Sequence, residues 1–415
     1  MEKIIKVLLT FLGSANKNRV PDKKEPFQQN SAYKKTVYSF QGKTMETPYV
    51  GVALSDFIRP DRTIVLGSSS SMWDDLLEYF KNAGEEEVRL ELIETREKES
   101  VSDALLARIA PLLAGPFQNP PILRVVPHDA SPKAQVEILH IMQQAVAKAA
   151  EEAGAEKVQL HIDITHSFRY YPLLAQQGAF LLEYSASPCV ILKGLYYGAF
   201  EMPREKESPT PILLLDGVMK IQEWIDALAR FDSNGDYAVF SSLLKNANIQ
   251  QVNLLEEAAY FERMFNAQDS SARLRSFMPC LDVPLVDRIL PLFLPELRRR
   301  CGWAQREHLH EKQRDLGDFY QRVGDYARAV IFFYESAISW ECKKKGENPL
   351  DFIDRDSAKE RLNASGEGKF LMMGQLRNAI AHGTPPNRSD AKTIMKDREA
   401  LKRTLREFRQ SFLSL

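Results

Sequence analysis

Cysteine is scarce in this 415-residue chain, and its four cysteines are too scattered to form a Cys-x-x-Cys pair. That scarcity argues against a zinc site and a disulfide framework, and it favours a reducing compartment. Clusters of Asp, Glu or His at metal-ligand spacing are missing as well. We therefore expect no bound metal and no resident cofactor.

Long apolar runs and an excess of one charge are also missing. No uninterrupted apolar stretch approaches the ~20 residues that a membrane span needs. Lys6 interrupts the first apolar run, and residues 16–19 are polar where a signal peptide would have small cleavage-site residues, so a β-strand and a cytoplasmic protein are expected. The formal net charge of -1 excludes a general nucleic-acid binder that relies on a basic surface. Any RNA contact must come from a local site.

Two familiar phosphate-binding patterns are absent. The chain has no Gly-x-x-x-x-Gly-Lys-Ser/Thr loop, which disfavours a nucleotide-hydrolysing P-loop. It also lacks Gly-x-Gly-x-x-Gly after the first expected strand, which disfavours a dinucleotide-dependent oxidoreductase.

The first half of the chain alternates short apolar runs with helical patterns. The alternation predicts a Rossmann-like α/β domain with a parallel, helix-flanked sheet. Expected strands are residues 4–12, 63–66, 122–126, 158–164, 190–197 and 212–215, and the clearest helices are 73–80, 134–153 and 171–184.

Strand signals stop near residue 221, and the rest of the chain is predicted to be all-α. Expected helices are residues 224–230, 252–265, 286–300, 326–343, 370–382 and 391–412. A break in the pattern at residues 232–235 places the boundary near Phe231, which gives domains of residues 1–230 and 231–415.

Three loops at the ends of expected strands are unusually small and hydroxyl-rich. In an open parallel sheet, ligands bind at the carboxyl ends of the strands, and the helix N-termini that follow offer N–H groups to phosphates. Ser71 also suits an ordinary helix N-cap. His166 fits a helix-capping role as well as ligand contact, and Asp163 is expected to be a structural carboxylate. The loop residues are Gly13, Ser14, Ala15, Asn16, Gly67, Ser68, Ser69, Ser70, Ser71, Thr165, His166 and Ser167.

Near the carboxyl end, Arg377, Asn378 and His382 lie within two turns of an expected helix that stops at Gly383. Asn378 and His382 are four apart and share a helix face, while Arg377 lies about 100° round. The helix dipole alone could favour Arg and His at this end. Yet the three groups can also bind a phosphate, orient a hydroxyl and move a proton, which are the needs of metal-free RNA cleavage.

The chemistry suggests a mechanism in which the RNA 2′-hydroxyl attacks the adjacent phosphorus and leaves a 2′,3′-cyclic phosphate. His382 would act as general base or acid, Arg377 would stabilise the phosphorane, and Asn378 would orient the histidine or a phosphate oxygen. Since each chain supplies one such histidine, we expect a composite site at a two-fold axis.

Two short basic runs, residues 298–300 and 343–345, fit solvated helix ends or turns, and either could rim an RNA groove. His308 and His310 are two apart. They are therefore expected on opposite sides of a helix, at the surface.

Taken in order along the chain, three of these segments resemble CRISPR-associated proteins that join an N-terminal CARF domain to a C-terminal HEPN domain. Residues 163–167 are similar to the Asp-x-Thr-His-Gly signature of the CARF domain, and residues 66–74 to its loop after the second core strand. Residues 377–382 are similar to the Arg-x4-His signature of the HEPN domain. Ser167 stands where the family usually has glycine, and its Cβ would alter the turn or the space for an adenine.

This resemblance implies a homodimeric, allosterically activated endoribonuclease of type III CRISPR antiviral defence. Its activator would be cyclic tetra- or hexa-adenylate, bound across paired CARF domains, with Met72, Trp73 and Arg169 among the contacts, and its substrate would be single-stranded RNA. The segment around Tyr334 resembles the family's other long HEPN helix, which implies packing and an ion pair for Glu335.

Two alternatives stay open. In one, the helical half only dimerises or recruits a partner, so that the protein is a sensor without ribonuclease activity. In the other, His166, Ser167 and Arg169 make the CARF domain cleave its own cyclic ligand, alone or beside RNA cleavage. The ring size, the RNA preference and assembly beyond the dimer are left undetermined by the sequence.

Overall fold

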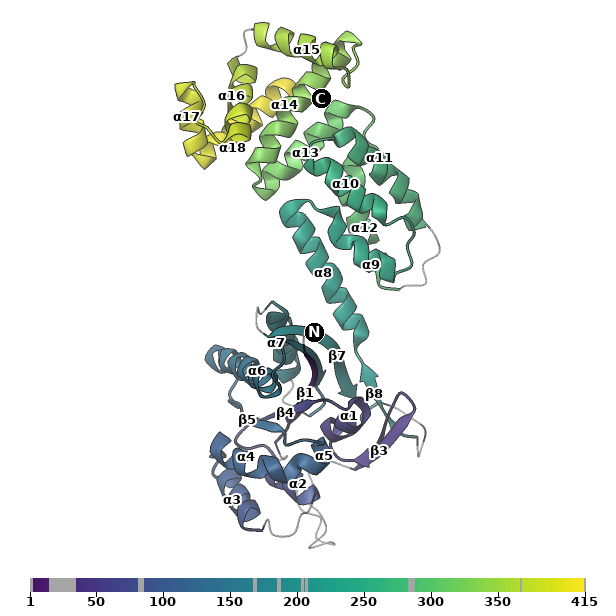
Figure 1. Cartoon of the computed structure of the whole chain (residues 1–415), viewed down its shortest axis with the longest axis vertical. Coiled ribbons are helices and arrows are strands. Elements are labelled where there is room, and N and C mark those ends of the chain that lie inside the picture. Colours follow the sequence, from purple (N-terminus) through teal and green to yellow (C-terminus); the bar gives the residue numbers. More distant parts are fainter. Residues whose placement is uncertain are drawn as a thin grey trace. The chain divides into compact units, whose positions relative to one another are not determined.

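The computed structural model describes residues 3–14, 35–80, 86–166, 170–184, 188–202, 205, 208–282, 288–365 and 368–413. The chain divides into two compact units, Met1–Met219 and Lys220–Leu415 (Figure 1). The division lies inside helix α8 (Asp216–Asn234), earlier than the boundary expected near Phe231. The pattern break at residues 232–235 instead marks the end of α8, where Gly235 has a φ of +74°.

An eight-stranded sheet forms the centre of the first unit, in the order β3-β2-β8-β7-β6-β1-β4-β5. All six strands expected from the sequence are present, and the fold class, α/β followed by all-α, is confirmed. The strands are β1 (Ile4–Leu12), β2 (Thr36–Phe40), β3 (Lys43–Thr47), β4 (Arg62–Gly67), β5 (Ile122–Val125), β6 (Lys157–Asp163), β7 (Cys189–Gly198) and β8 (Thr210–Leu214).

The sheet is mixed, so the expectation of a purely parallel sheet is wrong at one edge. Strands β5, β4, β1, β6 and β7 run parallel, whereas β8 is antiparallel to β7. Strands β2 and β3 form an antiparallel hairpin that the sequence prediction missed. Its turn, Gln41–Gly42, has positive φ at both residues, as a two-residue hairpin turn requires.

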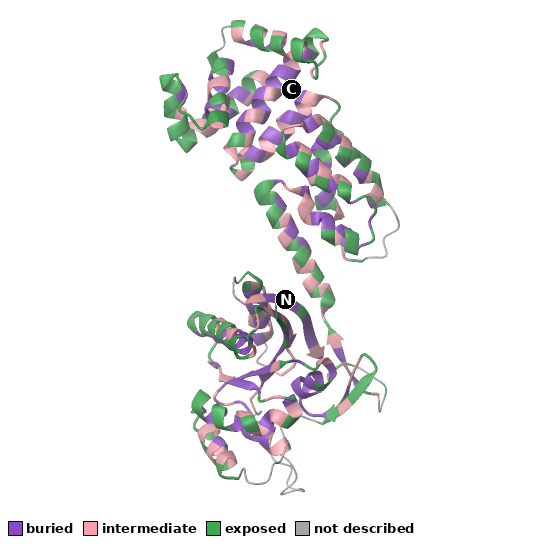
Figure 2. Ribbon diagram, in the orientation of Figure 1, coloured by how far each residue is buried: buried purple, intermediate pink, exposed green. Residues whose placement is uncertain are grey.

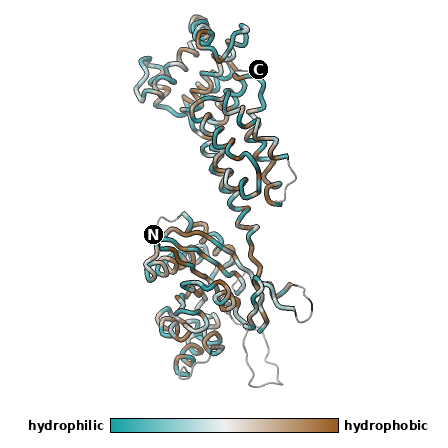
Figure 3. Tube along the Cα trace, turned by 45° about the vertical axis from the view of Figure 1, so that its right-hand side comes forward, coloured by the Kyte–Doolittle hydropathy of each residue, from teal (hydrophilic) through white to brown (hydrophobic). Residues whose placement is uncertain are grey.

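Helices cover both faces of the sheet, because alternate side chains of a strand point to opposite faces. Val7 and Leu9 of β1 pack with α6 and α7, while Leu8 packs with α1. The central strands β1, β4 and β6 are accordingly mostly buried and hydrophobic (Figures 2 and 3). The helices of this unit are α1 (Val50–Ile58), α2 (Trp73–Tyr79), α3 (Glu86–Glu97), α4 (Asp103–Ile109), α5 (Ala114–Phe117), α6 (Pro132–Ala153) and α7 (Tyr171–Glu183).

In the second unit, helix α14 forms the centre of a helical bundle and contacts α13, α15, α16 and α18. Among the described residues of the chain, no helix is both long and apolar enough to span a membrane. The helices after α8 are α9 (Ser241–Asn246), α10 (Asn253–Arg263), α11 (Ala267–Phe277), α12 (Leu290–Cys301), α13 (Leu309–Val323), α14 (Tyr326–Lys345), α15 (Phe352–Ala364), α16 (Gly368–His382), α17 (Ser389–Lys396) and α18 (Arg398–Leu413).

The single helix expected over residues 391–412 is wrong, because Asp397 divides it into α17 and α18. Asp397 has an extended backbone, with φ -125° and ψ 109°. Its carboxylate accepts from the N–H groups of Glu399 and Ala400, at 2.9 and 3.2 Å. The side chain therefore caps the start of α18, the role in which aspartate is favoured over a helix interior.

Candidate functional site

The described parts of the three loops singled out in the sequence lie at one edge of the sheet. Strands β6, β1 and β4 are neighbours and parallel, so their carboxyl ends lie together. From β1 the chain adds β4 and β5 on one side, and it then crosses back to place β6 and β7 on the other side of β1. The space between β1 and β6 is therefore the topological switch point. Ala15, Asn16, Ser167 and Arg169 lie outside the described residues.

Serine hydroxyls tie the loop after β1 to the loop after β4. Ser14 Oγ lies 3.1 Å from Ser70 Oγ and 3.4 Å from Ser68 Oγ. Ser71 Oγ accepts from the Ser68 N–H at 2.8 Å and donates to the Leu12 carbonyl at 2.7 Å. Ser68 and Ser71 are buried, whereas Ser14 and Ser70 are partly exposed. The partly exposed hydroxyls are therefore the groups that can meet a ligand.

Met72 and Trp73 support this edge from beneath. Both side chains are completely buried, and Trp73 Nε1 donates to the Ser68 carbonyl at 2.9 Å. A Cβ on Gly67 would lie only 2.6 Å from the Trp73 ring, so glycine lets the indole pack under the loop. The expectation that these two side chains contact a ligand does not fit this burial.

The N-terminus of α2 is not the open anion site that the sequence suggested. The Trp73 N–H donates to the Ser71 carbonyl at 2.8 Å, and the Met72 N–H donates to the Gly13 carbonyl at 3.1 Å. Asp74 and Asp75 occupy the first turn, and Arg96 pairs with Asp74 at 2.8 Å. Burial and the neighbouring Asp74 raise the pKa of Asp75 to about 6. An anionic ligand at this edge therefore gains little from the start of α2.

Asp163 holds the end of β6 in place. Its carboxylate accepts from the Thr10 hydroxyl at 2.7 Å, and from the Thr165 N–H and hydroxyl at 2.9 and 2.6 Å. Thr165 Oγ1 in turn accepts from the Gly198 N–H at 2.8 Å. Burial raises the pKa of Asp163, and these hydrogen bonds oppose the rise. The geometry fits the expected structural role, since the carboxylate joins β6 to β1 and, through Thr165, to β7.

His166 caps a helix in this structure. Its Nε2 accepts from the Val50 N–H at 3.3 Å, at the start of α1, where Tyr49 supplies no side-chain cap. Because Nε2 accepts, the ring proton must lie on the other nitrogen, and the ring also bonds to the Pro48 carbonyl. Of the two roles left open for His166, these contacts favour capping.

Acid is expected to weaken the first unit through His166. Burial lowers the pKa of this imidazole from 6.5 to about 4. Between those values the unfolded chain binds the proton and the folded chain does not, so stability present at neutral pH is lost as the pH falls. The loss is at most about 1.4 kcal/mol per pH unit. Urea unfolding at pH 7 and pH 5 measures this effect. Between the two pH values, the free energy of unfolding should fall more for the native chain than for His166→Gln. An equal fall in both would contradict the role assigned to a neutral His166.

The C-terminal cluster lies on the last turns of α16, where Asn378 and His382 are exposed and Arg377 is half-buried. Arg377 Nη1 donates to Asn378 Oδ1 at 3.1 Å. Gly383 has a φ of +64°, and the Thr384 N–H donates to the Ala379 carbonyl at 3.2 Å. This is the left-handed helix stop expected after His382. All three side chains can therefore be reached from solvent.

Packing against α14 fixes α16. The rings of Tyr334 and Phe370 stack with centroids 4.8 Å apart and planes 15° apart. Burial raises the pKa of Tyr334, and the positive charge of Arg377 opposes the rise, which places the guanidinium beside α14. Glu335 forms an ion pair with Arg355, as predicted. The end of α16 that carries Arg377, Asn378 and His382 thus sits on a rigid support.

The expectation for His308 and His310 is wrong. His308 precedes α13 as its N-cap residue, so helical spacing does not apply to it. The two rings stack at 5.6 Å on the same side, and His310 is buried against Trp340 at 4.7 Å. Within the part of the chain that the structure describes, no group of three or more His, Cys, Asp or Glu residues could hold a metal ion.

Comparison with known proteins finds relatives among CRISPR-associated proteins. Residues 7–201 match the family model of the CARF domain of the CRISPR system endoribonuclease Csx1. CRISPR-associated protein MJ1674 of Methanocaldococcus jannaschii is 26% identical over 422 aligned positions, which cover 93% of this chain and 63% of that protein. The chain therefore spans less than two thirds of this relative's length.

A solved structure to which the chain is similar is Enterococcus italicus Csm6 bound to cyclic hexa-2′-fluoro-hexa-dAMP. It is 9% identical with a TM-score of 0.37, covering 98% of this chain and 94% of the Csm6 chain. The resemblance to CARF-containing CRISPR-associated proteins that the sequence predicted is confirmed by the family match and by the relative from M. jannaschii.

Proposed function

Given a first unit of the Csx1 CARF type, we propose that this protein is a homodimeric, ligand-activated endoribonuclease of type III CRISPR defence. The first unit senses cyclic oligoadenylate, and the second unit, as a HEPN-type domain, cuts single-stranded RNA in the cytoplasm. The observation that carries the proposal is the cluster at the end of α16, with Asn378 and His382 exposed and Arg377 half-buried, in a chain whose residues 7–201 match a CARF domain.

The sheet edge of the first unit suits a ring of nucleotides. Its partly exposed groups are small and neutral, namely Gly13, Ser14, Ser69, Ser70 and Thr165. Small residues allow a ligand to approach the backbone, and hydroxyls can bond to phosphate and ribose without a lysine. A cyclic tetra- or hexa-adenylate has two-fold symmetry, so two copies of the same loops can bind its two halves.

Cleavage needs only the chain's own side chains, because the nucleophile belongs to the RNA. The 2′-hydroxyl loses its proton to one His382 as it attacks the adjacent phosphorus, and the leaving 5′-oxygen gains a proton from the His382 of the second chain. Arg377 lies beside the developing charge of the phosphorane. Asn378, whose amide oxygen is bonded to Arg377, sets the position of that guanidinium. The products are a 2′,3′-cyclic phosphate and a 5′-hydroxyl.

Activation follows if the cyclic oligoadenylate, called the ring below, binds more tightly to the dimer arrangement in which the two α16 ends face each other. The ring then shifts the population toward that arrangement by its difference in affinity for the two states. Without the ring, the two His382 side chains do not share a phosphate, and cleavage is slow.

Fluorogenic single-stranded RNA incubated with EDTA tests the proposal. Cleavage should appear with cyclic tetra- or hexa-adenylate and not with linear hexa-adenylate, and the fragments should carry 2′,3′-cyclic phosphates. No cleavage with any ring, or cleavage that EDTA abolishes, would contradict it.

The alternative in which the CARF domain degrades its own ring is not favoured by the contacts of His166, because Val50 already donates to Nε2. Chromatography of the ring after incubation separates this activity from RNA cleavage.

A further inference from the structure

A cavity of about 390 Å³ lies in the second unit, between α8, α12 and α13. Four arginines line it, Arg299, Arg300, Arg306 and Arg322, together with the aromatic rings of Trp303 and Phe319. None of these residues belongs to the α16 cluster or to the sheet edge of the first unit. The function proposed above leaves this cavity without a role.

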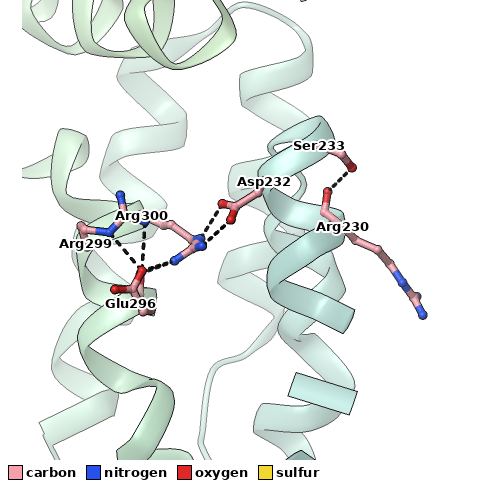
Figure 4. Close-up of polar contacts among 6 residues, drawn as sticks. All are labelled: Arg230, Asp232, Ser233, Glu296, Arg299 and Arg300. Atoms are coloured by element: carbon pink, nitrogen blue, oxygen red, sulfur yellow. Dashed lines mark hydrogen bonds and ion pairs between the residues drawn. The ribbon is translucent and has the colours of Figure 1, made fainter. Parts of the chain in front are cut away.

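Arg300 forms a wall of the cavity. Its Nε and Nη2 bond to the two carboxylate oxygens of Asp232 at 2.9 and 2.6 Å, and Nη1 bonds to Glu296 at 2.6 Å (Figure 4). The guanidinium also lies over Phe231 at 5.7 Å, and only 6% of the side chain is exposed. The solvated helix end expected for this basic run is therefore wrong at Arg300, which joins α12 to α8.

The other three arginines keep donors to spare. Among the residues that the structure describes, Arg299 bonds to Glu296, with Nε and Nη2 each at 3.0 Å, and 58% of its side chain is exposed. Arg306 bonds to Asp315 through Nε at 2.6 Å and is 53% exposed. Arg322 is exposed above Phe319 at 5.6 Å. Since a guanidinium has five N–H groups, each of the three can still bind an anion.

Positive charge exceeds negative charge around the cavity. Glu296 is shared by two arginines, and Asp315 pairs with Arg314 as well as Arg306. Of the charged residues that line the cavity, four are arginines and two are aspartates, which leaves two positive charges. A phosphate would offset this excess.

The aromatic rings add a second kind of contact. Trp303 donates its Nε1 proton to Tyr237 Oη at 2.6 Å, which fixes the indole in one orientation. Phe319 is half-buried at the wall, beneath Arg322. Guanidinium groups bind phosphate through paired hydrogen bonds, and aromatic faces stack on bases. The volume lies within the range of small-molecule sites.

We propose that this cavity binds a nucleoside monophosphate unit, either as a free nucleotide or as one nucleotide of an RNA chain. The phosphate lies among Arg299, Arg306 and Arg322, and the base lies against Trp303 and Phe319. This site is independent of the α16 cluster, so it does not require that the protein cleave RNA.

Calorimetry on the full chain tests this site, with uridine 5′-monophosphate as the probe because the first unit is proposed to hold adenylates. We expect binding to the native chain, weaker by about tenfold or more in Arg299→Gln/Arg322→Gln. Both side chains are exposed, so this variant should fold. Arg273→Gln is the matched control, since Arg273 pairs with Glu257 at 2.8 Å and lies over Phe261 outside the cavity.

Inorganic phosphate tests the contact with the arginines, and uridine tests the contact with the aromatic rings. Each should bind more weakly than uridine 5′-monophosphate, which makes both contacts. A short oligouridylate is then tested as a competitor of uridine 5′-monophosphate, in the His382→Ala chain so that the RNA is not cut. Competition indicates that the cavity binds one nucleotide of an RNA chain, and lack of competition indicates that it binds a free nucleotide. No nucleotide binding, equal binding of inorganic phosphate, or an equal loss in Arg273→Gln would overturn the proposal. His382→Ala should bind the probe normally, so failure of the ribonuclease proposal leaves this result unaffected.

Discussion

His382→Ala is expected to lower ring-activated RNA cleavage by about 10²–10⁴-fold, the contribution of a general acid or base. The side chain is exposed on the last turn of α16, so its loss should change the free energy of unfolding by no more than about 0.5 kcal/mol. The measurement is the cleavage rate of fluorogenic RNA at saturating cyclic oligoadenylate, with a melting curve on the same sample.

His128→Ala is the control for this change. His128 is 53% exposed in the first unit, and its Nε2 lies 4.0 Å from a Glu99 carboxylate oxygen. The control should cleave like the native chain. If His382→Ala also cleaved at the native rate, the role assigned to this histidine would be wrong.

Asp163→Ala is expected to produce the largest loss of stability, about 2–5 kcal/mol. The substitution removes the acceptor of three hydrogen bonds from Thr10 and Thr165, and it leaves the Thr165 N–H without that partner. Asp163 holds Thr165, and Thr165 accepts from the Gly198 N–H, so the substitution should loosen the loop after β6. Activation of RNA cleavage by cyclic oligoadenylate should then fall. Urea unfolding and titration with cyclic oligoadenylate measure the two effects.

The matched control is Asp56→Ala, because Asp56 is exposed on α1. It should change the free energy of unfolding by about 0.5 kcal/mol or less. If Asp163→Ala were no less stable than this control, the carboxylate would not hold β6 in place.

The core strands could be predicted because each is a short apolar run between turn signals, as in β1 and β6. The hairpin of β2 and β3 escaped prediction because both strands are short and mostly not buried, and β3 is largely polar. Residues 41–42 were the available signal, since a glycine in a two-residue turn favours a hairpin. The break at Asp397 was missed because periodicity continues through a capping residue that turns the chain for only one position.

In the candidate sites too, features that depend on neighbouring residues could be predicted, and features that depend on packing between distant segments could not. The placement of His382 before a left-handed Gly383 follows from local sequence, and the structure shows it. Whether Trp73 faces a ligand or the core depends on packing under Gly67, which no spacing rule contains. The arginine-lined cavity escaped prediction because its residues come from four separate segments between residues 231 and 322.

The central claim is that two chains contribute one active site, and mixed dimers test it most directly. Native and His382→Ala chains carrying different tags are refolded together in varied proportions and assayed with ring and RNA at constant total protein. If each cut needs a histidine from both chains, activity should follow the square of the native fraction. A linear dependence on the native fraction would show that each chain cuts alone and would contradict the account.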